Sequence, residues 1–333
     1  MFKPLLKIAK ATSIGKKVKK SIQRNGFLLL LYKVILQRMI DYAYPPTFNI
    51  EPTNACNLTC RMCPRENSRK GIGFMDMGLF TKIIDESVKY EHGNFILHKD
   101  GEPLLHKDIG NMMRIIRNKN KKSSIYISTN GIALTEEIAR SFIETGLDRL
   151  NISIDAVIPE TYKKVKGGML DRVEKNVENL LALKKKLYTK KPLITLQIIK
   201  MEETLNEIDG FVKKWSKYDV DISILYFRTW GSGAKSDITL KEQNTKKRYP
   251  CHALWFSPAI NWNGEVSLCC ADWNCDEIIG NVNKQTLSEI WQNEKLYRYR
   301  KYHLLGEYDK IPICKDCNYW QEAPDIWFWW QKK

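Results

Sequence analysis

Between residues 46 and 230, short apolar runs alternate with longer stretches in which apolar residues recur every three or four positions. The short runs are rich in Ile, Leu and Phe, as buried strands are, and the longer stretches have the spacing of amphipathic helices. We predict six strands, at 47–53, 94–98, 124–129, 149–155, 193–201 and 221–227. Helices are expected between them, at 79–91, 109–120, 135–146, 171–187 and 204–217.

This regular alternation of strand and helix is typical of parallel sheets built from βαβ units. Six units over about 180 residues favour an open, partial barrel over a complete eight-stranded one. We therefore predict an α/β protein with a partial (β/α)6 TIM-like barrel in residues 46–230. Its functional groups should lie at the carboxyl ends of the strands.

The pattern changes after residue 230. The segment 231–248 is polar and contains glycines, which is typical of a linker. Alternating residues on both sides of Asn263–Gly264 predict a β-hairpin with a type I′ turn. A helix is expected at 287–300, and the aromatic tail 326–330 is expected to pack against a neighbouring domain. Residues 231–333 are thus predicted to form a linker and a small α+β domain.

Composition and cysteine usage indicate the compartment. The chain has 333 residues, of which 43% are hydrophobic, and no run approaches the roughly 18 apolar residues of a membrane span. The apolar run 27–36 contains Lys33 and is not followed by a signal-peptide cleavage site. We expect a cytoplasmic protein, in which nine cysteines are better explained as metal ligands than as disulfides.

The formal net charge is +16, and residues 1–45 carry ten Lys or Arg against one acid, Asp41. One interpretation of this basic amphipathic segment is a solvated, partly disordered leader. Another is peripheral contact with an anionic membrane, because apolar residues recur at near-helical spacing between the lysines. These are Phe2, Leu5, Leu6 and Ile8. RNA contact is the third interpretation, and nucleic acid is not the partner that we expect.

Three cysteines, Cys56, Cys60 and Cys63, follow the first predicted strand in a CxxxCxxC arrangement. That position is the mouth of the predicted barrel. Four thiolates would complete a tetrahedral zinc site or a four-iron cluster. Three would leave one iron of a [4Fe–4S] cluster open to a chelating ligand, such as the amine and carboxylate of an amino acid. A zinc site is the alternative.

This loop on a six-unit βα scaffold resembles the radical S-adenosylmethionine (radical SAM) superfamily over residues 46–229. Three strand ends carry further matching segments: "DGEP" at 100–103, "STNG" at 128–131 and "SID" at 153–155. The resemblance implies that a [4Fe–4S] cluster on the three cysteines binds S-adenosylmethionine (SAM). It also implies reductive cleavage of SAM to a 5′-deoxyadenosyl radical, which abstracts hydrogen from an unactivated C–H bond.

The resemblance also implies roles for individual residues. The segment at 101–103 is similar to the one that meets the methionine amine, and Ser153 and Asp155 suit the ribose hydroxyls or the methionine carboxylate. Met62 stands where the family places a side chain that stacks on adenine, although an aromatic residue is common there. The predicted cofactor-binding residues are Met62, Gly101, Glu102, Pro103, Ser128, Asn130, Ser153 and Asp155.

Six further cysteines lie in the C-terminal third. Cys251 precedes Cys269 by eighteen positions, and a CxxC pair ends the series. This arrangement, with the "GxxxxC" of 264–269, resembles the shortened SPASM or twitch domain of some radical SAM enzymes. The resemblance implies one auxiliary [4Fe–4S] cluster held by Cys251, Cys269, Cys314 and Cys317. A zinc ribbon is the alternative. Cys270 should point away from this site, because neighbouring strand residues face opposite sides, and Cys275 is expected to be structural.

An all-cysteine auxiliary cluster could accept an electron from a substrate radical, and an α-hydroxy radical that loses an electron and a proton becomes a ketone. We therefore predict a radical SAM oxidoreductase of the dehydrogenase type, reduced by a flavodoxin or ferredoxin. Its substrate would be a small molecule or glycan: a sugar, an aminocyclitol or an envelope-glycan precursor. The predicted catalytic residues, as proton acceptors near strand ends, are His98, Lys99 and Arg228.

Three alternatives remain. The first is modification of a ribosomal peptide, and the second is sugar epimerisation with Cys270 or Cys275 returning a hydrogen atom. The third is a metalloprotein that only binds RNA or membranes. The intact three-cysteine loop argues against the third, because such a protein has no use for an open iron.

Overall fold

The computed structural model describes residues 26–40, 44–89, 93–231, 233 and 248–321. Most of the predicted linker, the basic residues 1–25 and the aromatic tail lie outside the described residues. Within the described part of the chain, no helix has both the length and the apolar character needed to cross a membrane.

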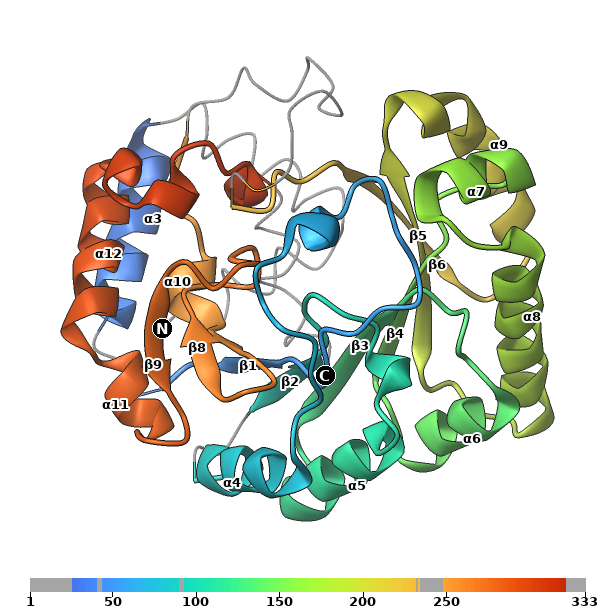
Figure 1. The fold of residues 1–333 in the computed structure, drawn as a ribbon, viewed down its shortest axis with the longest axis horizontal. Coiled ribbons are helices and arrows are strands. Elements are labelled where there is room, and N and C mark those ends of the chain that lie inside the picture. The colour runs from blue at the N-terminus through green and yellow to red at the C-terminus, as the bar shows by residue number, and fades with distance from the viewer. Residues whose placement is uncertain (1–25, 41–43, 90–92, 232, 234–247, 322–333) are drawn as a thin grey trace.

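A single sheet of nine strands organises the molecule, in the order β6-β5-β4-β3-β2-β1-β7-β8-β9. The first six strands are parallel and curve into an open barrel (Figure 1). They are β1 (Thr47–Ile50), β2 (Asn94–Leu97), β3 (Ser124–Thr129), β4 (Arg149–Ser153), β5 (Leu193–Lys200) and β6 (Asp221–Tyr226). All six predicted strands and the partial (β/α)6 barrel are confirmed.

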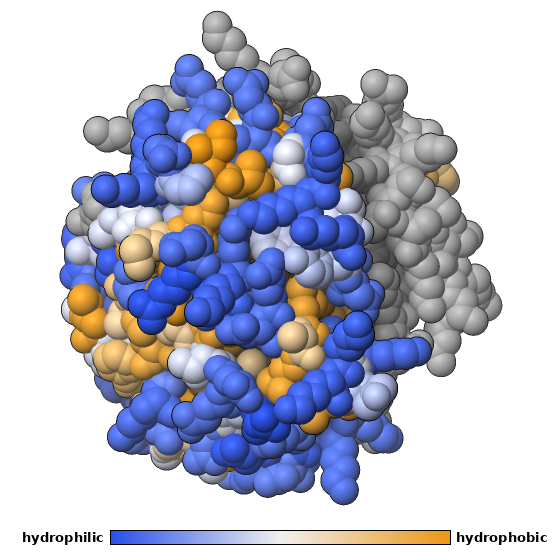
Figure 2. All heavy atoms as spheres, turned by 90° about the vertical axis from the view of Figure 1, so that its right-hand side faces the viewer, coloured by the Kyte–Doolittle hydropathy of each residue, from blue (hydrophilic) through white to orange (hydrophobic). Residues whose placement is uncertain are grey.

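Helices cover the outer face of the barrel and connect each strand to the next, with both α7 and α8 between β4 and β5 (Figure 1). They are α4 (Met77–Ser87), α5 (Ile109–Lys119), α6 (Glu136–Glu144), α7 (Pro159–Lys166), α8 (Leu170–Lys186) and α9 (Ile208–Trp215). The helix expected at 204–217 starts instead as the 3-10 turn Glu202–Glu207. Helix α7 was not predicted, because its eight residues bury only Tyr162, Val165 and Lys166. On the side of α7, α8 and α9, the surface is mostly hydrophilic, with smaller apolar areas between (Figure 2).

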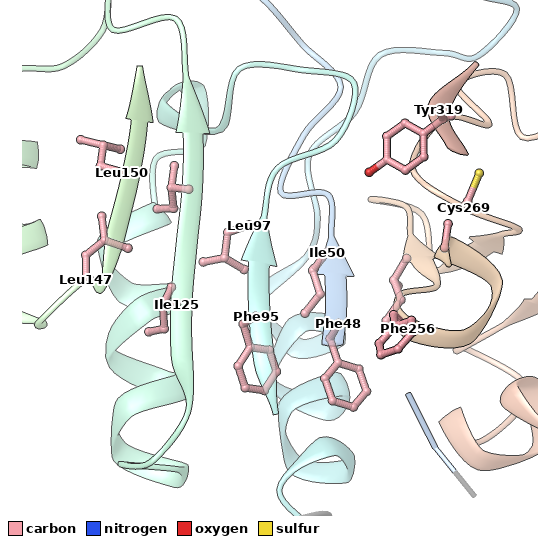
Figure 3. Close-up of a cluster of buried hydrophobic side chains, with 14 of the residues drawn as sticks. Phe48, Ile50, Phe95, Leu97, Ile125, Leu147, Leu150, Phe256, Cys269 and Tyr319 are labelled. Carbon is pink, nitrogen blue, oxygen red and sulfur yellow. The ribbon is translucent and has the colours of Figure 1, made fainter. Parts of the chain in front are cut away.

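The core lies between the strands and these helices. Apolar side chains of β1, β2 and β3 are buried in this layer, where Phe48, Phe95 and Ile125 are all at most 1% exposed (Figure 3). The rings of Phe48 and Phe95 stack at 5.4 Å across β1 and β2. Each such side chain contributes about 1.5–3 kcal/mol of hydrophobic free energy when fully buried. The core therefore holds the strand ends, and the loops that follow them, in fixed positions.

The C-terminal region extends the barrel sheet. Strand β7 (Ala259–Ile260) pairs in parallel with β1, opposite Asn49 and Ile50, and β8 (Glu265–Ser267) and β9 (Ile278–Asn281) continue the sheet in antiparallel pairs. The sequence pattern predicted the hairpin but not its pairing with β1. This pairing fixes the second cysteine set relative to the loop that carries Cys56.

The predicted type I′ turn at Asn263–Gly264 is wrong. Gly264 has φ +88°, but Asn263 has no positive φ, and a type I′ turn requires one at both positions. Instead the Gly264 N–H donates to the Asn261 carbonyl oxygen at 2.8 Å. The Asn263 side chain closes the loop by accepting the Glu265 N–H at 3.1 Å.

The helix predicted at 287–300 is two helices, α11 (Leu287–Trp291) and α12 (Glu294–Leu305). The break occurs because Asn293 caps the second one, its side chain accepting the Leu296 N–H at 2.7 Å. Helix α3 (Gly26–Met39) packs beside α12 through the buried Tyr32 and Leu36 (Figure 1). The short helix α10 (Ala253–Phe256) completes the C-terminal region.

Candidate functional site

The loop after β1 carries the three predicted cluster ligands, all half-buried: Cys56, Cys60 and Cys63. Polar side chains at its start hold its shape. Thr53 Oγ1 donates to the Gly73 carbonyl oxygen at 2.6 Å, and the Asn54 amide both donates to Gly71 O and accepts from Gly73 N at 2.8 Å. The Cys63 N–H donates to Cys60 O at 2.9 Å. The loop is therefore shaped by bonds that do not use the thiols.

Gly101 lies directly against this loop. A β-carbon on Gly101 would be 2.3 Å from the carbonyl oxygen of Thr53 and 2.6 Å from that of Ala55, which is closer than atoms can approach. The next residue, Glu102, donates its N–H to Ala55 O at 2.8 Å, and Pro103 begins a short 3-10 turn. The 101–103 segment and the cysteine loop are thus in backbone contact, which only glycine permits.

Glu102 connects two of the predicted motifs. Its buried carboxylate accepts from Thr129 Oγ1 at 2.6 Å, from Asn130 N at 2.7 Å and from Leu104 N at 3.1 Å. Asn130 in turn donates to Asn57 Oδ1 at 2.8 Å and lies 4.0 Å from Cys56 Sγ. A carboxylate has about four lone-pair sites, so Glu102 can accept one more donor.

Ser128 belongs to a different group, inside the barrel. Its hydroxyl accepts from Asn151 Nδ2 at 2.9 Å, and the same nitrogen lies 3.1 Å from Gln197 Oε1. Its N–H donates to His98 Nδ1 at 3.2 Å. Nothing in the sequence pattern distinguished Asn151 or Gln197 as members of this polar layer.

A buried cation that the sequence did not indicate, Lys166, organises the "SID" segment. Its Nζ lies 2.8 Å from both Ser153 Oγ and Asp155 Oδ2. The other oxygen of Asp155 accepts the Ile199 N–H at 2.9 Å, so both oxygens of this fully buried carboxylate already have protein donors. Burial lowers the pKa of Lys166, but the Asp155 charge and the neighbouring Cys60 outweigh burial, so the pKa is raised. Lys166 therefore stays charged beside Cys60.

Met62 lies in a small apolar cluster, separate from the main core, that also includes Val165, Met201 and Phe227. Cys60 packs against this cluster. Met62 therefore contributes to an apolar wall beside one of the three thiols, which suits the flat face of a purine ring.

The second cysteine set gathers in the C-terminal region. Cys251, Cys269 and Cys314 are buried, and Cys317 is half-buried. Burial raises the pKa of Cys251 to about 12, and the negative charge of Cys317 adds to the effect. Burial also raises the pKa of Cys269, and the charges of the adjacent Cys270 and of Cys314, Cys317 and Cys251 add to the effect. The four sulfurs are thus close enough to interact electrostatically (Cys269 is shown in Figure 3).

In both sets the ligand chemistry fits an iron–sulfur cluster. Sulfur is the only donor type in each set, and desolvated thiols are ionised when they bind a metal. No three His, Cys, Asp or Glu side chains in the described ranges converge closely enough to hold a metal ion.

The two remaining cysteines lie near charged residues that follow β2 and β6. Cys270 is hydrogen-bonded to the Tyr319 hydroxyl and lies within electrostatic reach of Arg228 and Lys99. Cys275 has φ +58° and lies within reach of Lys99 and Lys70. Neither role predicted for them, structural residue or hydrogen-atom donor, is tested by these contacts.

A cavity of about 190 Å³ lies between the cysteine loop and the C-terminal region. Its walls include Cys63, Lys70, Lys99, Asp100, Trp230 and Trp273. The Asp100 carboxylate is 2.6 Å from Lys70 Nζ and 2.5 Å from Lys99 Nζ. The cavity thus combines a charged wall with two indoles, directly beside one of the predicted cluster ligands.

The three residues predicted as proton acceptors have different electrostatic surroundings. Asp100 and Glu51 outweigh the burial of Lys99 and raise its pKa, so this lysine stays charged. His98 already accepts a hydrogen bond at Nδ1, and its removal from water lowers its pKa to about 4. The Arg228 guanidinium, 4.7 Å from the Tyr319 ring centre, keeps its proton. The carboxylate nearest the cavity, Asp100, was missed although it begins "DGEP".

Comparison with protein families decides between iron–sulfur clusters and zinc sites. Residues 50–214 match the model of the radical SAM superfamily, and residues 251–318 match that of the SPASM iron–sulfur cluster-binding domain. The chain belongs to the radical SAM superfamily. This radical SAM enzyme binds SAM and two [4Fe–4S] clusters, as its sequence predicted.

The alignments with individual relatives cover different shares of this chain and of the relative. The S-adenosyl-L-methionine-dependent 2-deoxy-scyllo-inosamine dehydrogenase of Niallia circulans is 25% identical over 271 residues, 81% of this chain and 91% of the relative. A probable GTP 3′,8-cyclase of Methanococcus aeolicus is 34% identical over 187 residues, but the match spans only 54% of this chain and 59% of the cyclase. The crystal structure of BtrN in complex with AdoMet and 2-DOIA has 22% identity and a TM-score of 0.58, covering 82% of this chain and 92% of BtrN.

Proposed function

We propose that this enzyme oxidises a hydroxyl-bearing carbon of a sugar, an aminocyclitol or an envelope-glycan precursor to a ketone. The observation that carries the proposal is the cavity beside Cys63, which has the C-terminal region as its other wall. A substrate there would contact the loop of the first cysteine set on one side and, on the other, Trp273, which follows Cys269 by four residues. The similarity to a dehydrogenase over 81% of the chain supports this reaction type.

In this proposal, Cys56, Cys60 and Cys63 hold the cluster that binds SAM, and Cys251, Cys269, Cys314 and Cys317 hold the auxiliary cluster. Glu102, with its remaining acceptor site, and the backbone of Gly101 and Pro103 would receive the methionine amine. Lys166 and Ser153 would bind the carboxylate, while Asp155 positions Lys166. Met62 would contact the adenine, and Ser128 and Asn130 would complete the surroundings.

Oxidation of a CHOH group to a ketone removes one hydrogen atom, one electron and one proton. When bound, SAM and its cluster supply the hydrogen-atom abstraction, and the auxiliary cluster accepts the electron. We assign proton acceptance to Asp100, whose carboxylate lines the cavity. The ammonium groups of Lys70 and Lys99 would hold Asp100 in place, and the substrate hydroxyl would replace one of their hydrogen bonds. Arg228 would orient the substrate without exchanging a proton.

The electron that starts the reaction would come from a flavodoxin- or ferredoxin-type protein. The enzyme carries a formal net charge of +16, so an acidic electron carrier would be attracted to it.

The proposal is tested with anaerobically reconstituted enzyme, SAM and a panel of aminocyclitols and sugars deuterated at each carbinol position. A substrate should transfer deuterium into 5′-deoxyadenosine and yield one ketone for each 5′-deoxyadenosine formed. Cys314→Ser should preserve SAM cleavage but abolish the ketone, whereas Cys275→Ser should retain both. An inverted alcohol in place of a ketone would identify an epimerase, and a modified peptide would identify the other alternative; either result would refute the dehydrogenase proposal.

A further inference from the structure

Helix α3 exposes a continuous apolar stripe. Phe27, Leu30, Leu31 and Val34 are 70%, 59%, 38% and 42% exposed. Their spacing of three and four residues places them on one face of the helix. Single exposed apolar residues are ordinary, but a contiguous apolar patch marks a surface that contacts something else. We define these four residues as the α3 stripe.

The opposite face of the same helix is already docked. Tyr32 and Leu36 are 7% and 0% exposed, and the Tyr32 hydroxyl donates to Pro250 O at 3.2 Å. The Tyr32 ring also makes an edge contact with the Tyr249 ring at 6.0 Å. Because these contacts fix the helix against the C-terminal region, the α3 stripe cannot turn inward. A helix that is apolar on both faces needs a second apolar environment.

The charge around the stripe indicates what that environment is. Residues 26–39 contain Lys33 and Arg38 and no acid, and the adjacent α12 exposes Arg298 and Lys301 and one acid, Glu294, in its first turn. The chain that precedes α3 adds eight Lys or Arg and no acid in residues 1–24. A complementary partner is therefore apolar in its interior and negatively charged at its surface. A bilayer containing anionic lipids has both properties.

We propose that the α3 stripe and the basic residues around it bind the surface of an anionic membrane. The fourteen residues of α3 are too few to span a bilayer, so the helix would lie in the interface with the stripe directed toward the acyl chains. Lys33 and Arg38 would reach the lipid phosphates along their aliphatic stems. The C-terminal region would then lie next to the membrane, and the mostly hydrophilic side with α8 would face away from it (Figures 1 and 2).

The test is sedimentation of the full-length, reconstituted enzyme with vesicles of phosphatidylcholine, with and without phosphatidylglycerol. The enzyme should bind the mixed vesicles, and the double variant Phe27→Ser with Leu30→Ser should bind at least about tenfold more weakly, since two exposed apolar side chains are removed. The matched control is Leu187→Ser with Tyr188→Ser, which removes two apolar residues, 40% and 97% exposed, after α8. The control should bind as the original enzyme does.

If something other than a membrane covers the α3 stripe, light scattering and vesicle binding give a different result. If a second copy covers it, the original enzyme is a dimer in light scattering, the Phe27/Leu30 variant is a monomer and neither binds vesicles. If another part of the same chain covers it, the enzyme is a monomer that does not bind vesicles. Either result overturns the proposal, as does equal vesicle binding by the stripe variant and the control. All variants should form 5′-deoxyadenosine at the original rate, so failure of the membrane proposal is separate from failure of the proposed reaction.

Discussion

Asn318 and Thr229 exchange two hydrogen bonds. The Thr229 N–H donates to Asn318 Oδ1 at 2.9 Å, and the Asn318 N–H donates to Thr229 Oγ1 at 3.1 Å. The Asn318 side-chain amide also donates to the Phe227 carbonyl oxygen at 3.0 Å. Because Asn318 follows Cys317, these bonds connect the second cysteine set to the end of β6. They involve Phe227 and Thr229, the residues on either side of Arg228 in the sequence. The C-terminal region is therefore held in a fixed position relative to the barrel mouth.

Replacing Asn318 by Ala should therefore loosen the coupling between SAM cleavage and product formation. Cleavage needs only the barrel, so the rate of 5′-deoxyadenosine formation should change less than twofold, on the order of RT in free energy. The yield of product per 5′-deoxyadenosine should fall by about tenfold, the cost of roughly one buried hydrogen-bond pair. Chromatography of both products measures this ratio. Asn206→Ala, at an exposed asparagine, is the control; an unchanged ratio in Asn318→Ala would contradict the coupling.

Gly101→Ala should damage the first cluster selectively. The added β-carbon would meet the carbonyl oxygens of Thr53 and Ala55, so the cysteine loop would have to move. We expect the variant to lose about four irons per chain after reconstitution, one cluster's complement, and to keep the rest. The control is Gly71→Ala, because a β-carbon there meets nothing within 4 Å. Iron and sulfide analysis of both variants measures the loss. Full iron content in Gly101→Ala would show that the contact of Gly101 with Thr53 and Ala55 does not constrain the cysteine loop.

Lys166→Met should destabilise the protein by about 3–5 kcal/mol, because it leaves the Asp155 carboxylate buried without its cation. The side chains of Lys166 and Asp155 are 4% and 0% exposed, so water cannot replace the lost partner. Lys163→Met lies on the same helix and is exposed, which makes it a matched control. Denaturant unfolding under anaerobic conditions gives both free energies. Equal stability of the two variants would mean that the buried pair contributes nothing net.

His98 predicts a pH dependence of stability. Its pKa is lowered in the folded state to about 4, from 6.5, so between these values the unfolded chain binds more protons. This contribution to stability is complete above pH 6.5 and is lost as the pH falls toward 4. In His98→Asn, which keeps an acceptor for the Ser128 N–H, the decline from pH 6.5 to 5 should be shallower by up to about 1.4 kcal/mol per pH unit. Parallel declines of the unfolding free energy in both proteins would exclude His98 as the cause.

Local patterns predicted most of the fold. In β3 and β5, buried apolar residues alternate with less buried ones, which is the periodicity that predicted these strands. Helix α6 begins where Thr135 accepts the Ile138 N–H at 3.3 Å. The pairing of β7 with β1 could not be predicted in this way, because two residues that pair across more than 200 positions leave no periodic signal. The type I′ turn predicted at Asn263–Gly264 was wrong for a local reason. The Asn263 side chain accepts the Glu265 N–H, and this hydrogen bond competes with the backbone geometry that an Asn-Gly pair usually favours.

The candidate site was predictable where it depends on motifs with a fixed spacing. Cysteine spacing and the strand-end segments marked the cofactor region before any geometry was known. Lys166 carries no such mark, because it is one of three lysines in a short helix and only its burial beside Asp155 distinguishes it. The pKa shifts of His98 and Lys99 could not be predicted, because they depend on the burial of His98 and on Asp100 and Glu51 near Lys99, which only the structure gives.

The proposed reaction requires that the thiolates of Cys56, Cys60 and Cys63 leave one iron of a [4Fe–4S] cluster open to SAM. The most direct measurement is electron paramagnetic resonance of the reduced, anaerobically reconstituted Cys314→Ser variant, in which the first cluster dominates the spectrum. Addition of SAM should shift the g values of the reduced cluster, and Cys60→Ala should abolish the signal together with 5′-deoxyadenosine formation. A spectrum that SAM leaves unchanged, with the first cluster intact, would contradict the account.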